Sequence, residues 1–70
     1  MKRKAAYSYI RTVGTAMITK DMTGLNLNER RAVAHHLLIA DGYPTRVVEM
    51  LTQWFPAQIL REHGFTGKAR

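Results

Sequence analysis

Glycine and proline residues divide the second half of this chain into short segments, and they limit the folds that it can adopt. The stretch from Gly42 to Gly64 reads GYPTRVVEMLTQWFPAQILREHG. Glycine takes the left-handed conformation that ends helices at little cost, and the residue before a proline is disfavoured in an α-helix. The pattern therefore predicts a short helix after Gly42, a break at Phe55-Pro56, and a second short helix that ends at Gly64. Two short helices joined by a tight break are typical of a helix-turn-helix unit.

Apolar residues in the first half of the chain recur at helical spacing and predict two further helices. The first is expected over residues 4–19 and the second over residues 29–40, separated by a connection rich in turn-forming residues. Asn28 is the predicted N-cap of the second helix, with Leu27 in front of it as a hydrophobic staple. The residues expected to be buried are Ala6, Ile10, Val13 and Met17 in the first helix and Val33, Ala34, Leu37, Leu38 and Ala40 in the second.

Each of the two later helices has an apolar face and a defined start. Pro44 suits the first turn of one helix, and Pro56 opens the other, which is expected over residues 57–63. Gly64 is the predicted stop, with Phe65 folded back on the last turn as in a Schellman closure. The residues expected to face the core are Val47, Val48, Leu51, Trp54 and Phe55 in the first of these helices and Ile59 and Leu60 in the second.

These elements predict an all-α protein with a single domain over residues 1–70. We expect a small bundle of about four helices whose last two form the helix-turn-helix unit. A basic arm over residues 1–4 precedes the bundle, and a flexible basic tail over residues 66–70 follows it. The chain has no cysteine, so disulfides and Cys-ligated zinc are excluded as supports. Because a core this small is marginally stable, we expect a homodimer, with the first helix as its contact.

Nothing in the sequence predicts a membrane segment or a secretory signal. No apolar run reaches the roughly 18 residues that span a bilayer, and the basic start is followed by too polar a stretch for a signal peptide. We therefore expect a cytoplasmic protein with no membrane partner.

The charge balance favours an anionic partner, and double-stranded DNA is the one predicted. Eleven lysines and arginines stand against five acidic residues, which gives a net charge of +6. In a helix-turn-helix unit the second helix enters the major groove, where glutamine pairs with adenine, arginine with guanine and alanine with a thymine methyl. Helix N-termini and basic arms contact phosphates or the minor groove. The expected DNA-binding residues are therefore Lys2, Arg3, Lys4, Thr45, Arg46, Ala57, Gln58 and Arg61.

Residues 38–62 resemble the N-terminal helix-turn-helix of FlhC-type flagellar transcriptional activators. The shared features are Gly42 after an apolar helix end, the apolar pair Val47-Val48, Thr52-Gln53 before Trp54, and Ile59-Leu60 before the basic Arg61. They cover about a third of the chain. FlhC-type chains continue into a cysteine-rich zinc region and have an arginine-rich start to the second helix, whereas this chain has Ala57-Gln58 there and no cysteine. The resemblance implies a cut-down DNA-binding module that regulates transcription, or a mimic that pairs with such regulators, from a bacterium, a phage or a plasmid.

A protein-interaction module, such as an inhibitor or an accessory subunit of a larger protein, is the alternative. A DNA reader needs Gln58 and Arg61 exposed beside a continuous positive face, whereas a protein-binding surface would expose Trp54 or Phe55 in an apolar patch. Stacking of nucleobases on these two aromatic residues is a third reading. Aromatic residues at helical spacing with valine and leucine belong to a core more often, so we assign both to the core.

No enzymatic activity, cofactor or metal site is expected. No nucleophile stands in a recognisable motif, and the sequence has no Gly-rich phosphate loop. His35 and His36 are adjacent, so on a helix their side chains point about 100° apart and do not chelate one ion. We expect one of them at the edge of the core and the other in solvent.

Overall fold

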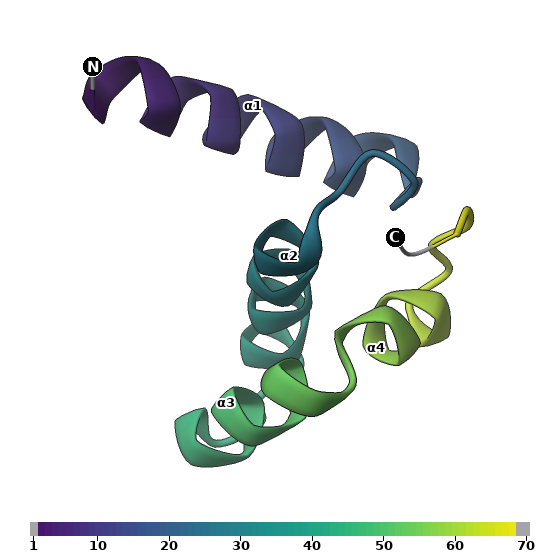
Figure 1. Cartoon of the computed structure of the whole chain (residues 1–70). Helices are drawn as coiled ribbons and strands as arrows, with labels where there is room; N and C mark the ends of the chain where they lie inside the picture. The colour runs from purple at the N-terminus through teal and green to yellow at the C-terminus, as the bar shows by residue number, and fades with distance from the viewer. Residues whose placement is uncertain (1, 69–70) are drawn as a thin grey trace.

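The computed structural model describes residues 2–68, with side chains from residue 11 onward, and its four helices confirm the all-α prediction. They are α1 (Lys2–Thr19), α2 (Leu27–Ala40), α3 (Thr45–Trp54) and α4 (Pro56–Glu62). Figure 1 shows α1 lying across one end of α2, with α3 near the other end. Among the described residues α2 contacts all three other helices, whereas α1 contacts α2 alone. The N-terminal half of α1 consequently projects away from the other helices (Figure 1).

The start of α2 differs from the prediction, because Asn26 rather than Asn28 caps it. The Asn26 side chain accepts a hydrogen bond from Glu29 N at 2.8 Å, and Asn26 N donates to the Glu29 carboxylate at 2.8 Å. This reciprocal pair is a capping box. The predicted N-cap Asn28 is therefore wrong, and so is the staple by Leu27, which is exposed in the first turn of α2. Only Asn26 has a glutamate three residues later, and this spacing decides between the two asparagines.

Both predicted glycine stops are confirmed, and the same backbone motif closes both helices. Gly42 and Gly64 have φ values of 91° and 86°, in the left-handed region. Each glycine N–H donates to the carbonyl three residues back, and the next residue donates to the carbonyl five residues back, at 2.9–3.2 Å. These are the two bonds of a Schellman closure. At Gly64 the closure folds Phe65 into the core, as the sequence predicts.

The core lies between α2 and the elements around it. Its members are Val13, Ala16, Met22, Leu25, Val33, Ala34, Leu38, Val48, Ile59, Leu60 and Phe65, with Leu37, Leu51 and Ala57 packed against them. Met17 and Ala40, which the sequence places in the core, are exposed. The contact of α1 with the rest of the chain is centred on Val13 and Ala16, so Met17 turns partly toward solvent. The side chains of Ala6 and Ile10 lie outside those that the structure describes.

Residues 20–25 are packed rather than looped out, because the C-terminal segment pairs with them. Thr66 N donates to Lys20 O at 2.8 Å, and Met22 N donates to Thr66 O at 3.0 Å, which forms an isolated parallel bridge. Met22 and Leu25 are fully buried beside this bridge. We call residues 20–25 and 65–67 the seam. Thr66, with which the predicted flexible tail begins, is instead held in the seam, and residues 69–70 of that tail lie outside the described residues.

Candidate nucleic-acid interface

The break between α3 and α4 consists of a single residue, Phe55. With φ −132° and ψ 43° it is the C-cap of α3 and the N-cap of α4. Its N–H donates to Leu51 O at 2.8 Å, and its carbonyl accepts from Ile59 N at 3.1 Å. Pro56 is the first residue of α4, where its missing N–H costs no hydrogen bond. The two short helices and the break are thus as predicted, but the connection is shorter than the roughly three or four residues usual in a helix-turn-helix.

On α4, two of the predicted base-reading side chains are exposed and one is not. Gln58 and Arg61 both face solvent. Ala57 is half-buried and packs against the core, so little of its methyl group remains for a thymine contact. Glu62 is exposed directly after Arg61. The outer surface of α4 therefore presents an amide, a guanidinium and a carboxylate.

The predicted phosphate contacts lie in two separate places. Thr45 and Arg46 open α3 and are exposed, and no side chain caps that helix end. Residues 2–4 (Lys2, Arg3 and Lys4) form the first turn of α1, where the sequence predicts an arm, and their side chains lie outside the described ones. Figure 1 places α1 and α3 near opposite ends of α2. Residues 45 and 46 therefore lie at the start of α3 and residues 58 and 61 on α4, whereas residues 2–4 lie at the projecting end of α1.

Charge is distributed unevenly along the chain. Residues 1–20 hold five basic side chains and no acidic one, whereas residues 45–62 hold two basic and two acidic side chains. The acidic pair is Glu49 on α3 and Glu62 on α4, and both are exposed. The surface of α3 and α4 is neutral overall, so these two helices alone do not build the continuous positive face that a DNA reader needs.

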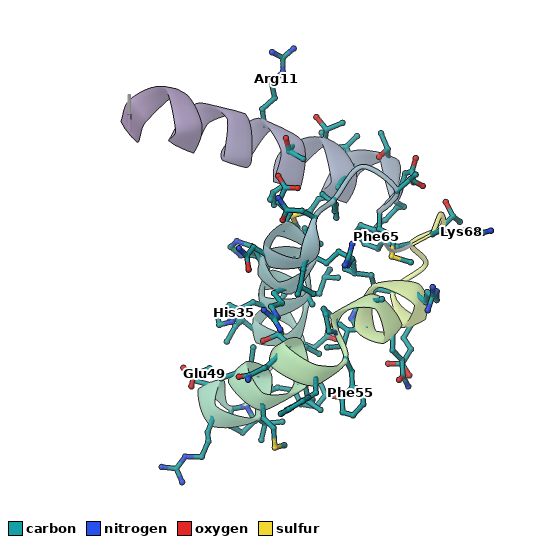
Figure 2. The ribbon with its side chains drawn as sticks, in the orientation of Figure 1. Arg11, His35, Glu49, Phe55, Phe65 and Lys68 are labelled. Atoms are coloured by element: carbon teal, nitrogen blue, oxygen red, sulfur yellow. The ribbon has the colours of Figure 1, made fainter. Side chains whose placement is uncertain are left out.

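Large apolar side chains are exposed around the break, against the prediction that Trp54 and Phe55 belong to the core. Trp54 is 68% exposed, Met50 56%, Phe55 52% and Tyr43 47%. Figure 2 shows Phe55 at the outside of the corner between the two helices. The reason lies in α3, whose buried face is centred on Val48. A residue six positions later points about 120° away from it, so Trp54 turns to solvent.

Tyr43 and Phe55 also line a shallow groove. It has a volume of about 310 Å³, and its other lining residues are Leu38, Leu51, Gln58, Ile59 and Glu62. The groove lies beside the candidate base-reading face, since Gln58 borders both. The exposed Gln58 and Arg61 expected of a DNA-binding helix and the exposed aromatic side chains expected of a protein-binding surface are therefore both present beside α4, without the continuous positive face.

His63 ties the end of α4 to the end of α2. Its Nδ1 lies 2.8 Å from Ile59 O, and its Nε2 lies 2.7 Å from Asp41 Oδ2. A carbonyl and a carboxylate both accept, so the doubly protonated ring is the form that donates both bonds. The bond to the Ile59 carbonyl and then the bond to Asp41 raise the pKa of His63 above its ordinary value. His63 is thus engaged in a structural contact. His35 is half-buried and His36 exposed, as predicted for that pair.

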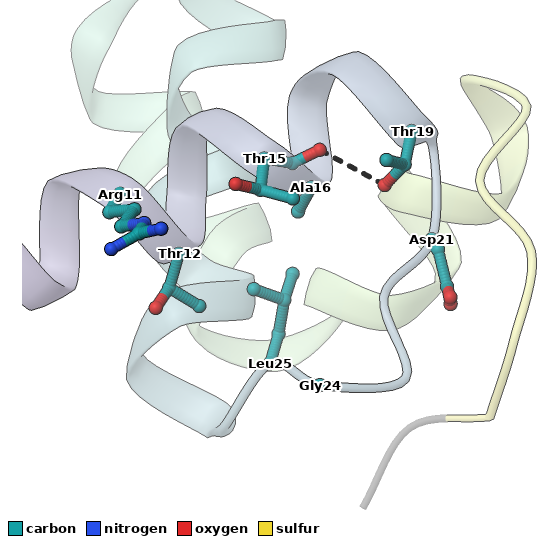
Figure 3. A pocket seen from close by; sticks show the side chains of 8 residues that line it. All are labelled: Arg11, Thr12, Thr15, Ala16, Thr19, Asp21, Gly24 and Leu25. Atoms are coloured by element: carbon teal, nitrogen blue, oxygen red, sulfur yellow. Dashed lines mark hydrogen bonds between the residues drawn. The ribbon is translucent and has the colours of Figure 1, made fainter.

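A second, more polar groove lies between α1 and residues 21–25 (Figure 3). It has a volume of about 440 Å³, and its lining residues are Arg11, Thr12, Thr15, Ala16, Thr19, Asp21, Gly24 and Leu25. The Thr19 hydroxyl donates to Thr15 O at 3.0 Å, and Asp21 Oδ1 accepts from Thr23 N at 2.9 Å. The hydrogen bond from the Thr23 backbone N–H, and then the one from the Thr23 hydroxyl, lower the pKa of Asp21. These groups serve local turns and do not form a nucleophile and base pair.

Comparisons with protein-family models, with curated proteins and with solved structures give no match for this chain. Within residues 2–68 no group of three or more histidine or acidic side chains is placed to hold a metal ion. None of the described helices combines the length and the hydropathy that crossing a bilayer requires.

Proposed function

We propose that this chain binds DNA and regulates transcription, with α4 supplying contacts to base edges. The observation that carries the proposal is the joint exposure of Gln58 and Arg61 on one short helix that follows a tight break. An amide and a guanidinium are the side chains that pair bidentately with adenine and guanine. Arg46, exposed at the start of α3, supplies a phosphate contact.

The first 20 residues supply the remaining attraction to the DNA backbone. They contain five basic side chains and no acidic one, and α1 projects from the other helices. In this proposal Lys2, Arg3 and Lys4 lie along a phosphate backbone, which compensates for the neutral surface of α3 and α4. A homodimer through α1 belongs to the same proposal, because a small core favours association and paired half-sites need two copies.

Fluorescence anisotropy of the purified protein with random-sequence duplex DNA, over a range of salt concentrations, tests this function. We expect roughly micromolar or tighter binding. If about five phosphates are neutralised, the slope of log affinity against log salt concentration lies near −4 to −5. A folded protein that binds no duplex at low salt would refute the DNA-binding function.

The substitution Arg61→Ala separates base reading from phosphate contact. If Arg61 reads a guanine, the substitution weakens specific binding by about 1–3 kcal/mol and relaxes the preference at that base. Arg11→Ala is the matched control, because it removes an exposed arginine from α1. We expect it to weaken binding equally on all sequences and to reduce the salt slope by about 1. An equal loss on all sequences for Arg61→Ala would make Arg61 a phosphate contact.

Protein binding is the second candidate function, and the groove beside Tyr43 and Phe55 favours it. The groove has an apolar floor, and its two aromatic side chains are about half exposed. An inhibitor or accessory subunit would cover this surface with an apolar side chain of its partner. The anisotropy experiment discriminates between the two candidates, since a protein-binding module has no reason to bind duplex DNA with a steep salt dependence.

A further inference from the structure

Trp54, the only tryptophan of the chain, stands at the end of α3 with about two thirds of its surface in solvent. Tryptophan is highly buried on average, and its exposure is informative because other large side chains are exposed beside it. Trp54 does not line the groove formed by Tyr43 and Phe55. A protein side chain would insert into that groove, whereas the ring of Trp54 offers a flat face to a planar ligand.

Two arginines lie along the surface of α3 that carries Trp54. Arg46, Met50 and Trp54 are spaced four residues apart on α3, so they form one stripe, and all three are exposed. We call these three residues the α3 stripe. At its other end the Arg31 guanidinium, carried by α2, donates from Nη2 to Gln53 O at 3.1 Å, one residue before Trp54. One exposed arginine therefore lies two helical turns before Trp54 on the same face of α3, and a second, half-buried arginine contacts the backbone one residue before it.

The acidic neighbour of the α3 stripe is Glu49. It lines a shallow depression with Arg31, Thr52 and Gln53, so it lies beside the cation at the Trp54 end. Figure 2 shows Glu49 and Phe55 on different sides of the corner between α3 and α4. Glu49 and the two arginines leave the surroundings of the stripe with one net positive charge. This charge and the apolar ring match a ligand that combines a flat aromatic group with phosphates.

We propose that the α3 stripe binds single-stranded DNA, with an unpaired base stacked on Trp54 and the flanking phosphates on Arg46 and Arg31. In a duplex the faces of the bases are covered by their neighbours, so only an unpaired base can present its face to the ring. Stacking of a base on an aromatic side chain depends little on sequence, because every base has a π-face. The inference rests on the proposed function, since it takes DNA as the polyanion, and it adds a second form of DNA to the ligands of α3 and α4.

The intrinsic emission of Trp54 tests the inference in the unmodified protein, because no other tryptophan contributes. We would titrate the protein with single-stranded oligothymidylate, with random-sequence duplex, and with heparin as a polyanion that has no bases. We expect the oligothymidylate to quench Trp54 and heparin to leave its emission unchanged. Anisotropy of the same oligonucleotides measures binding independently of the tryptophan.

Three variants complete the test. Trp54→Leu is expected to weaken oligothymidylate binding about tenfold while duplex binding is unchanged, because it removes the stacking ring and keeps an apolar side chain. Trp54→Phe, which keeps a smaller ring, is expected to bind oligothymidylate with an affinity between those of the unmodified protein and of Trp54→Leu. Leu27→Ala is the matched control, since Leu27 is 45% exposed on α2, outside both the α3 stripe and the proposed contact through α1, and it should leave oligothymidylate binding unchanged. Circular dichroism establishes that each variant is folded.

The possible failures distinguish this inference from the proposed function. Oligothymidylate binding without a change in Trp54 emission, or with equal affinity for Trp54→Leu, overturns the inference and leaves the proposed function standing. Binding of duplex DNA without binding of oligothymidylate likewise overturns the inference and leaves the proposed function standing. Binding of neither form overturns both. A Trp54 emission that changes with protein concentration in the absence of DNA identifies the α3 stripe as a contact between proteins and also overturns the inference.

Discussion

The two phenylalanines of the chain flank α4, and they have opposite environments. Phe65 follows the last turn and is 4% exposed, whereas Phe55 precedes the first turn and is 52% exposed. Phe65 is folded inward by the Schellman closure at Gly64 and is covered by the seam, where Lys20 Nζ lies 5.1 Å from the centre of its ring. Among the described residues no comparable segment covers Phe55. Burial of a side chain in so small a protein therefore depends on a covering segment more than on residue type.

The same contrast separates two regions of the molecule. The seam and the elements beside it bury Met22, Leu25 and Leu60 completely. The corner between α3 and α4 leaves Met50 and Trp54 exposed. We infer that the seam stabilises the fold, and that the corner is the surface left for ligands. If this division is correct, substitutions in the seam affect stability and substitutions at the corner affect binding.

The largest expected difference is between Phe65→Ala and Phe55→Ala. Removal of the buried ring leaves a cavity and should cost about 3–5 kcal/mol of the free energy of unfolding. Removal of the half-exposed ring should cost about 1 kcal/mol or less, because much of that ring is already in water. Urea denaturation followed by circular dichroism measures both. If Phe65→Ala is too unstable to fold, Phe65→Leu, with an expected loss below about 1.5 kcal/mol, replaces it. Equal losses at the two positions would contradict the division.

Gly67→Ala tests the seam at its backbone. Gly67 has φ 93°, and a methyl group there would meet the Thr23 hydroxyl and lie 2.6 Å from Asp21 Oδ1. We expect a loss of about 1–3 kcal/mol in the free energy of unfolding, because both the conformation and the contact are unfavourable. Gly24→Ala is the matched control, since no atom lies within 4 Å of the added methyl group. That variant should be unchanged or more stable by about 0.5 kcal/mol. A Gly67→Ala protein as stable as the original would show that the seam contributes little.

Sequence patterns predict the helix ends and the core of this fold better than they predict the exposed corner between α3 and α4. The glycine stops, the break at Phe55-Pro56 and the core positions of α2 other than Ala40 follow from local rules, because backbone conformation and helical spacing decide them. The burial of Met22 and Leu25 does not, since a distant segment creates it by pairing Thr66 with residues 20–22. The sequence around these two residues is rich in turn formers, and no local pattern predicts the isolated parallel bridge.

The sequence predicts which residues of α4 face outward in the candidate site, but it does not predict the exposed aromatic side chains beside them. The sequence indicates that Gln58 and Arg61 lie outward on α4, because Ile59 and Leu60 occupy its inner face. It does not indicate that Trp54 is exposed, since the apolar spacing of α3 is compatible with a wide buried face. The width of that face depends on how much of α3 its neighbours cover, and α4 has only 7 residues. Such coverage is a property of the assembled helices rather than of either sequence segment.

Asn26→Ala tests the cap at the point where the seam joins α2. It removes the capping box, and we expect a loss of about 1 kcal/mol in the free energy of unfolding. Asn28→Ala is the matched control and should change that free energy by less than about 0.5 kcal/mol, because Asn28 is exposed in the first turn and is not the cap. Urea denaturation of the two variants side by side provides the measurement. A larger loss for Asn28→Ala would place the start of α2 where the sequence pattern puts it.

The smallest expected effect is the pH dependence contributed by His63. This residue joins the two regions, because it follows α4 near the seam and bonds Asp41 at the end of α2. Its pKa is raised in the folded protein, first by the bond to the Ile59 carbonyl and then by that to Asp41. The contribution to stability is therefore complete below the unfolded pKa of about 6.5 and is lost as the pH rises through the higher folded value.

Because Asp41 is 47% exposed and screened by solvent, we expect this contribution to be about 0.5 kcal/mol. Urea denaturation at pH values on either side of neutrality should show it as a loss of stability toward alkaline pH. Asp41→Asn should reduce that loss, since the amide oxygen still accepts a bond but carries no charge to favour the protonated ring. His36→Gln, which removes an exposed imidazole from α2, should leave the loss as it is. An Asp41→Asn protein with an unaltered pH dependence would mean that the Ile59 carbonyl alone holds the ring, and that α2 and α4 are joined by packing rather than by this bond.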